Sequence, residues 1–240
     1  LEPTLKEQCF FQSGMALYNL ALKSEGKSRK AALGAAIDDF NQQLAHSPEG
    51  TLAMQAAFYR CEAYYAWGAT STAAKEYLAL LEKYANHPQR AEALYGLGVA
   101  EQETGKFVKA ATTLDKFTTE FPGHAAVADA RVRRAESLLA AGEHYLEIGQ
   151  AKEALAVLQT AAALPRWSRS DAVLLALADA EHGIGQPRDA IATIDRLLAE
   201  HAESGLADRA YRRRAESNAA CDQWSAAVAD YGAIVDQWPQ

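Results

Sequence analysis

The segment whose residue types come nearest to a known chemical motif is residues 21–28, Ala-Leu-Lys-Ser-Glu-Gly-Lys-Ser. It fits a relaxed phosphate-binding pattern in which alanine replaces the first glycine. Such a loop needs a strand before it and a helix whose amino end meets the phosphate. A helical pattern precedes it here and the sequence has no parallel-sheet pattern. We therefore interpret the segment as a surface loop and predict no nucleotide site.

The histidines, cysteines and carboxylates give no catalytic or metal-binding pattern either. The six histidines are scattered, and none shows the i, i+4 spacing of a helical metal pair. Cys9, Cys61 and Cys221 lie far apart without a Cys-x-x-Cys pair, so we expect free, packed thiols. Carboxylate pairs such as Asp38-Asp39 lack perturbing neighbours. The sequence therefore predicts a protein that is not an enzyme and binds no metal or cofactor.

Composition narrows the class of partner. The chain has 240 residues, of which 49% are hydrophobic and 23% charged, with a net charge of −7. This balance disfavours nucleic acid, because binding to phosphates depends on cationic side chains. No apolar run approaches the roughly 18 residues that a membrane span needs. We expect a protein or peptide partner.

The elements that must position any site follow from six alanines spaced 37, 37, 44, 36 and 37 residues apart. A large side chain follows each by four residues, and glycine precedes four of them by five residues. This pattern predicts six helices that share the same packing face, with a residue in the left-handed conformation before such a helix. The alanines are Ala36, Ala73, Ala110, Ala154, Ala190 and Ala227.

A second set of small residues lies upstream of these alanines, and prolines follow the second helices. Small side chains allow the two helices of a pair to approach closely. Proline cannot continue a helix and so separates the units. The small residues are Cys61, Gly98, Ala135, Ala178 and Ala215, and the prolines are Pro48, Pro88, Pro122, Pro165 and Pro239.

These features resemble the tetratricopeptide repeat, a helix-turn-helix unit of about 34 residues. The unit from Ala91 to Gly123 matches the family pattern almost throughout. The resemblance implies an all-α, right-handed α-solenoid over residues 1–240. Because the sequence opens with Leu1 rather than methionine, we expect it to be a fragment of a longer protein or a processed form. A narrower likeness to the repeats of bacterial envelope proteins, such as the outer-membrane assembly lipoprotein and the Tol-Pal coordinator, favours the periplasm while leaving localisation open. The expected units are 5–48, 51–87, 88–123, 124–166, 168–204 and 205–240.

Two units are longer than the others. The first has extra residues at 22–30, between its two helices, and the fourth at 143–149. The second insertion keeps helical spacing, so we expect it to lengthen its helix by about two turns. It serves either as a contact point or as a shield for the neighbouring repeat. The other helices are expected at 5–22, 31–46, 51–67, 71–85, 88–103, 106–120, 151–163, 169–183, 187–201, 205–220 and 223–237.

The resemblance also implies which side chains line the concave groove. Several are aromatic and are common binding anchors, although they can equally be half-buried between first helices. Others form an acidic column, which suits a basic peptide but also a solvated face. The candidates are Phe11, Tyr18, Phe58, Glu62, Tyr65, Tyr95, Glu136, Leu139, Asp179, Arg212 and Glu216.

Two further patterns bear on the partner. Repeats that bind the carboxylate tail of chaperones carry lysine and asparagine at two positions of the first helix. These positions hold Phe11 and Met15 in the first unit and Phe58 and Glu62 in the second. The sequence therefore lacks the residues of this carboxylate clamp. Arg209, Arg212, Arg213 and Arg214 are expected to be a solvated helix face or an anion site. The predicted function is a peptide-holding scaffold. The alternatives are a self-associating module, forming a homo-oligomer, and an adaptor domain of a larger envelope, secretion or enzyme assembly.

Overall fold

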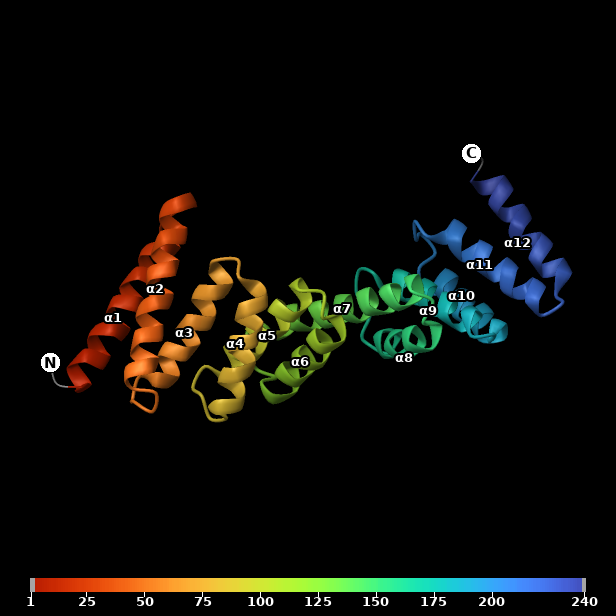
Figure 1. Ribbon diagram of the computed structural model, residues 1–240. Helices are drawn as coiled ribbons and strands as arrows, with labels where there is room; N and C mark the ends of the chain where they lie inside the picture. The colour runs from red at the N-terminus through yellow and green to blue at the C-terminus, as the bar shows by residue number, and fades with distance from the viewer. Residues whose placement is uncertain (1–2, 239–240) are drawn as a thin grey trace. The chain divides into compact units, whose positions relative to one another are not determined.

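The computed structural model describes residues 3–238, and within that range every regular element is an α-helix (Figure 1). The chain divides into two compact units, residues 1–134 and 135–240, and the division falls inside α7. The predicted all-α repeat of helical hairpins is confirmed. The arrangement of all six hairpins in one superhelix stays a prediction, and Pro239 lies outside the described residues.

The first unit contains three complete hairpins and the beginning of α7. Consecutive helices pack against each other, and each second helix also packs against the first helix of the next pair. The helices are α1 (Pro3–Leu22), α2 (Gly26–His46), α3 (Ala53–Ala66), α4 (Thr70–Lys83), α5 (Arg90–Glu103) and α6 (Phe107–Glu120).

The second unit repeats this arrangement from the carboxyl half of α7. Its α9 and α11 are each 14 residues long, whereas α7 has 21. The helices are α7 (Val127–Glu147), α8 (Ala151–Ala162), α9 (Ser170–Gly183), α10 (Pro187–Glu200), α11 (Ala207–Ala220) and α12 (Trp224–Gln237). None of the helices in residues 3–238 is long and apolar enough to cross a membrane.

The recurring alanines lie at the helix contacts, as predicted. Five of the six are fully buried and the sixth, Ala227, is 3% exposed. The upstream small residues lie on the facing helix, where Gly98 shows how close the approach is. A Cβ atom on Gly98 would lie 2.7 Å from Leu114 Cδ2, inside van der Waals contact. The two helices of a hairpin can approach this closely because these positions hold small residues.

The turns inside the hairpins use a left-handed residue at the predicted place. Gly105 has φ of 74° between α5 and α6, and the glycines of three other hairpins are similar. In the last hairpin Asp222 takes this position with φ of 60°, the only positive φ of a non-glycine residue in the described part of the chain. Asp tolerates this conformation better than most side chains.

Three expectations about the ends of elements need correction. Residues 26–30 form the first turns of α2, so the extra length of the first hairpin lies in its helices and the phosphate-loop-like segment is only partly a loop. Cys9 is exposed, since no other helix among residues 3–238 covers it, whereas Cys61 is buried as expected. Tyr231, four residues after the last alanine, is 44% exposed, since no other helix among residues 3–238 covers it. The predicted extension of α7 is confirmed, since that helix runs to Glu147.

Two hairpins contain a buried glutamate at the end of the first helix. Glu101 is 7% exposed and accepts a hydrogen bond of 2.7 Å from the Thr113 hydroxyl. Burial raises the pKa of Glu101, while the hydrogen bond from Thr113 and two lysines oppose that rise. Glu181 is equally buried in the second unit, and burial raises its pKa too. These carboxylates are held in the folded chain at a cost in desolvation.

We predict that Ala110→Trp lowers the free energy of unfolding by about 1–3 kcal/mol or more, because the ring overpacks the contact between α5 and α6. Urea unfolding measures the change. Lys109→Trp, on the exposed side of the same helix, is the control and should leave the midpoint nearly unchanged. An unchanged urea midpoint for Ala110→Trp would show that Ala110 does not face α5.

We predict that Glu101→Gln raises the free energy of unfolding at pH 7, since it removes a buried charge and keeps an acceptor for Thr113. The folded pKa of Glu101 lies above its unfolded value, so protonation favours the folded state. The native chain therefore gains stability as pH falls through that folded pKa, and the advantage of the variant shrinks. Urea unfolding at about pH 7 and pH 5 tests this. Glu82→Gln, at an exposed site, is the control, and a difference independent of pH would contradict the argument.

Candidate functional site

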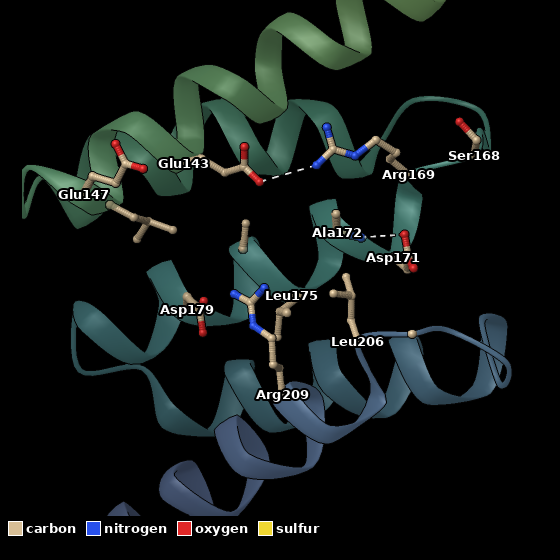
Figure 2. A pocket seen from close by; sticks show the side chains of 13 residues that line it. Glu143, Glu147, Ser168, Arg169, Asp171, Ala172, Leu175, Asp179, Leu206 and Arg209 are labelled. Carbon is tan, nitrogen blue, oxygen red and sulfur yellow. Dashed lines mark hydrogen bonds and ion pairs between the residues drawn. The ribbon is translucent and has the colours of Figure 1, made fainter. Parts of the chain in front are cut away.

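An open cleft of about 760 Å³ lies among the first helices of the second unit. The end of α7, the length of α9 and the beginning of α11 line it (Figure 2). Its lining residues are Glu143, Leu146, Glu147, Ser168, Arg169, Asp171, Ala172, Leu175, Ala176, Asp179, Gly205, Leu206 and Arg209.

The α7 wall of the cleft exists because that helix is long. Its 21 residues exceed the 14 of α9 by seven, or about two turns. The additional turns carry Glu143, Leu146 and Glu147, all of which line the cleft. The insertion predicted at 143–149 therefore forms one wall of the cleft. This location favours the contact-point interpretation of the insertion over the shielding one.

The floor of the cleft is apolar and rigid. Ala172, Leu175 and Ala176 lie along one face of α9, and Leu206 borders them at the start of α11. Leu175 is 4% exposed and belongs to the core cluster of the second unit, which also contains Ile194, Leu197 and Ala210. A ligand would therefore meet a preformed apolar surface.

Several charged groups of the cleft already have partners. Asp171 accepts a hydrogen bond of 2.6 Å from the Ser204 hydroxyl and another of 2.8 Å from the Ala172 backbone N–H. Asp179 accepts one of 2.5 Å from Arg213 Nε. A carboxylate oxygen of Glu143 lies 3.7 Å from a guanidinium nitrogen of Arg169, so these two side chains form an ion pair. These groups are held in place by the protein itself.

Two charges lining the cleft have no such partner. Glu147 and Arg209 are exposed, and neither makes a hydrogen bond or ion pair within residues 3–238. Figure 2 shows Glu147 on α7 and Arg209 on α11, with the α9 floor between them. The arrangement offers one free anion and one free cation beside an apolar floor. Within the same range, no three metal-binding side chains gather at one place.

The predicted aromatic residues of the first unit lie mostly inside it. Phe11 and Phe58 are each 6% exposed, and both rings pack against Tyr59. Tyr18 is half-buried 6.0 Å from the same ring, and burial raises the pKa of Tyr18 to about 12. Phe11 and Phe58 therefore support the wall between first helices rather than present a surface. Leu139 of the second unit is fully buried and has the same supporting place.

Tyr65 and Tyr95 join successive first helices. The Tyr65 hydroxyl donates to Glu103 at 2.6 Å, and the Tyr95 hydroxyl donates to Asp129 at 2.6 Å. Burial, followed by the contact with Glu103, raises the pKa of Tyr65 to about 12. Burial acts to raise the pKa of Asp129, but the hydrogen bonds from Tyr95 and Arg133 outweigh it and lower the pKa.

Most of the acidic residues predicted to line the groove accept hydrogen bonds or form ion pairs within the protein. Glu62 accepts a hydrogen bond from buried Tyr77, and burial raises the pKa of Glu62. In the second unit Arg213 donates to Asp179 and, at 2.6 Å, to Glu216. Arg212 lies 4.0 Å from Glu216, and Glu136 is half-buried. Of the eleven predicted groove residues, only Asp179 lines the cleft.

The four arginines of α11 have different roles, which their order in the sequence does not reveal. Arg214 makes hydrogen bonds to Asp230 and Asp195, and Arg213 pairs with Asp179 and Glu216. Only Arg209 faces the cleft without a partner within the described residues. The prediction of a solvated stripe or an anion site is therefore wrong for Arg213 and Arg214. A separation of 34 residues, close to one repeat, is the signal that could have paired Arg213 with Asp179.

Comparison with known proteins identifies one of the six helical hairpins. Residues 92–124 match the family model described as tetratricopeptide repeat. No curated protein sequence matches the chain.

Solved structures of similar architecture include YrrB, described as a TPR protein with an unusual peptide-binding site. It is 15% identical, with 84% of this chain and 93% of that chain covered and a TM-score of 0.49. MamA from Desulfovibrio magneticus RS-1 is 20% identical over 76% and 93%, with a TM-score of 0.42. The TPR2AB domain of yeast Sti1 in complex with pHSP90 is 16% identical over 95% and 89%, with a TM-score of 0.43.

We predict that Tyr95→Phe lowers the free energy of unfolding by about 1 kcal/mol, because Asp129 loses a hydrogen bond between successive first helices. Thermal or urea unfolding measures the loss. Tyr64→Phe is the matched control, since the Tyr64 hydroxyl has no hydrogen-bond partner in the part of the chain that the structure describes. Equal effects of the two substitutions would show that the contact with Asp129 contributes nothing.

Proposed function

We propose that the chain, in which residues 92–124 match the tetratricopeptide repeat, is a non-catalytic scaffold that holds a segment of another protein in the cleft between α7, α9 and α11. Repeats of this kind offer surfaces for protein partners. The observation that carries the proposal is the pair of unpartnered charges, Glu147 and Arg209, on two sides of an apolar floor.

The size of the cleft suits a short peptide segment. Its volume of about 760 Å³ falls within the roughly 300–1,000 Å³ of ordinary ligand sites. An apolar side chain on Leu175 and Ala176 would remove apolar surface from water, worth roughly 25 cal/mol per Å². The floor supplies the affinity for that side chain, and the charged walls supply specificity.

The charges define the chemistry of the segment. A basic side chain next to the apolar one would pair with Glu147, and an acidic one on the other side would pair with Arg209. Such complementary contacts fix the orientation of a ligand and suppress wrong partners more than they add affinity. The expected segment therefore carries an apolar residue between a basic and an acidic one.

The internal hydrogen bonds of the cleft support binding at low entropic cost. Ser204 fixes Asp171, and Arg213 fixes Asp179, so these side chains are ordered before a ligand arrives. Preorganised groups need not lose rotamer freedom on binding. A role in ligand contact for half-buried Tyr18 and Tyr65 of the first unit stays a prediction.

We predict that selection of a random peptide library on the protein yields sequences with an apolar residue between a basic and an acidic one. In fluorescence anisotropy, the charge exchange Glu147→Lys/Arg209→Glu should raise the dissociation constant of these peptides at least about tenfold, because each charged residue of the peptide then meets a like charge.

The matched control exchanges the charges of two exposed residues outside the cleft. Glu153→Lys/Arg188→Glu on α8 and α10 leaves the net charge unchanged, as the cleft variant does, and should bind like the native protein. Failure to select any common pattern, or equal binding by the cleft variant and the native protein, would reject the cleft as the site.

A further inference from the structure

The first hairpin is longer than the others at the end where its two helices join. In the five later hairpins the second helix begins three residues before the recurring alanine, whereas α2 begins ten residues before Ala36. The difference of seven residues corresponds to about two helical turns, or roughly 10 Å. Figure 1 shows this end of the hairpin reaching beyond the turn between α3 and α4. Residues 20–30 are here termed the basic tip.

The exposure of the basic tip follows from this length. Every residue at 22–30 is exposed except Ser24 and Arg29, which are half-buried. The neighbouring helix α3 ends at Ala66, and Ala66 packs against the cluster that contains Ala21 and Ala32. The end of the tip therefore lies beyond the level at which the adjacent hairpin turns. A hairpin of ordinary length beside the first one does not reach it.

The basic tip carries positive charge on an acidic chain. It has four cationic side chains and one carboxylate, a net charge of +3, whereas the whole chain has −7. Lys23, Lys27 and Lys30 are exposed, and their ammonium groups make no hydrogen bond or ion pair within residues 3–238. These three cations are therefore available to an anionic partner.

Exposed apolar side chains accompany these lysines. Leu20 and Leu22, in the last turn of α1, are 55% and 53% exposed. Trp67, which is 42% exposed, directly follows Ala66, whose side chain packs against the cluster of Ala21. Cations beside exposed leucine and tryptophan are the combination that a membrane interface binds. Lysines lie near the lipid phosphates, leucines enter the boundary of the acyl chains, and tryptophan lies at headgroup level.

The shape of the basic tip favours a surface over a peptide as its partner. A peptide segment or small ligand binds in a hollow that surrounds it. The tip contributes no residue to the cleft of α7, α9 and α11, nor to the hollow of about 190 Å³ in its own unit, which Leu44 and Leu80 line. A projecting end can instead bring its lysines and leucines to a flat anionic surface together.

We propose that the basic tip binds the headgroup surface of a bilayer that contains anionic lipids. Lys23, Lys27 and Lys30 attract the lipid phosphates, and each cation near such a surface adds to the affinity. Leu20 and Leu22 add the burial of apolar surface at the boundary of the acyl chains. The proposal is independent of peptide binding, because the tip and the cleft share no residue.

Co-sedimentation with lipid vesicles tests the role of charge. The native protein should bind vesicles of phosphatidylcholine and phosphatidylglycerol in equal amounts, and should not bind phosphatidylcholine alone. Lys23→Glu/Lys27→Glu should lower the partition coefficient on the anionic vesicles at least about tenfold. Lys75→Glu/Lys152→Glu changes the net charge equally at exposed sites outside the tip and should bind like the native protein. No binding by the native protein, or equal binding to both kinds of vesicle, would overturn the proposal.

A second variant separates a bilayer from an acidic protein as the partner. Leu20→Ser/Leu22→Ser keeps the charge of the tip but removes its apolar contact, so it should lower the partition coefficient at least about fivefold. Retention on immobilised polyglutamate should be the same for this variant and the native protein. Undiminished vesicle binding by the leucine variant would show that the tip recognises charge alone, and would overturn the bilayer as its specific partner. Circular dichroism confirms helicity in every variant.

Discussion

Close contact between helices at positions that hold only small residues is the constraint on which the rest of the structure depends. Gly98 lies against Leu114 so closely that even a methyl group would overlap it, and Ala110 is fully buried on the opposite helix. A helix packed this way buries one face against its partner and offers another to the next hairpin. Each hairpin is therefore stabilised by its neighbours.

The repeat could be predicted from the sequence because each contact recurs at a nearly constant separation. Ala110, Leu114 and Gly105 have counterparts in other hairpins, so their agreement identifies helix, turn and packing face together. The prediction failed where this repetition ends. Cys9 and Tyr231 occupy positions that are buried elsewhere, but no helix among residues 3–238 covers them, and periodicity alone does not show which helix covers which position.

The candidate site was harder to predict, because a column of equivalent positions need not have one environment. Phe58 and Arg212 hold the same position in the first helices of their repeats, yet Phe58 is buried against Tyr59 while Arg212 is exposed. Which environment applies depends on side chains of the adjacent first helix, one repeat away in the sequence. The insertion at 143–149 was visible in the sequence, but its position opposite Arg209 depends on how α7, α9 and α11 are arranged in space.

Polar contacts between neighbouring first helices explain why few charges remain for a partner. Tyr65 with Glu103, Tyr95 with Asp129 and Arg213 with Asp179 each join residues 34 to 38 positions apart. These contacts use the carboxylates that a groove would otherwise present as a uniform acidic surface. A chain with net charge of −7 can for this reason hold a cleft whose charges are locally balanced.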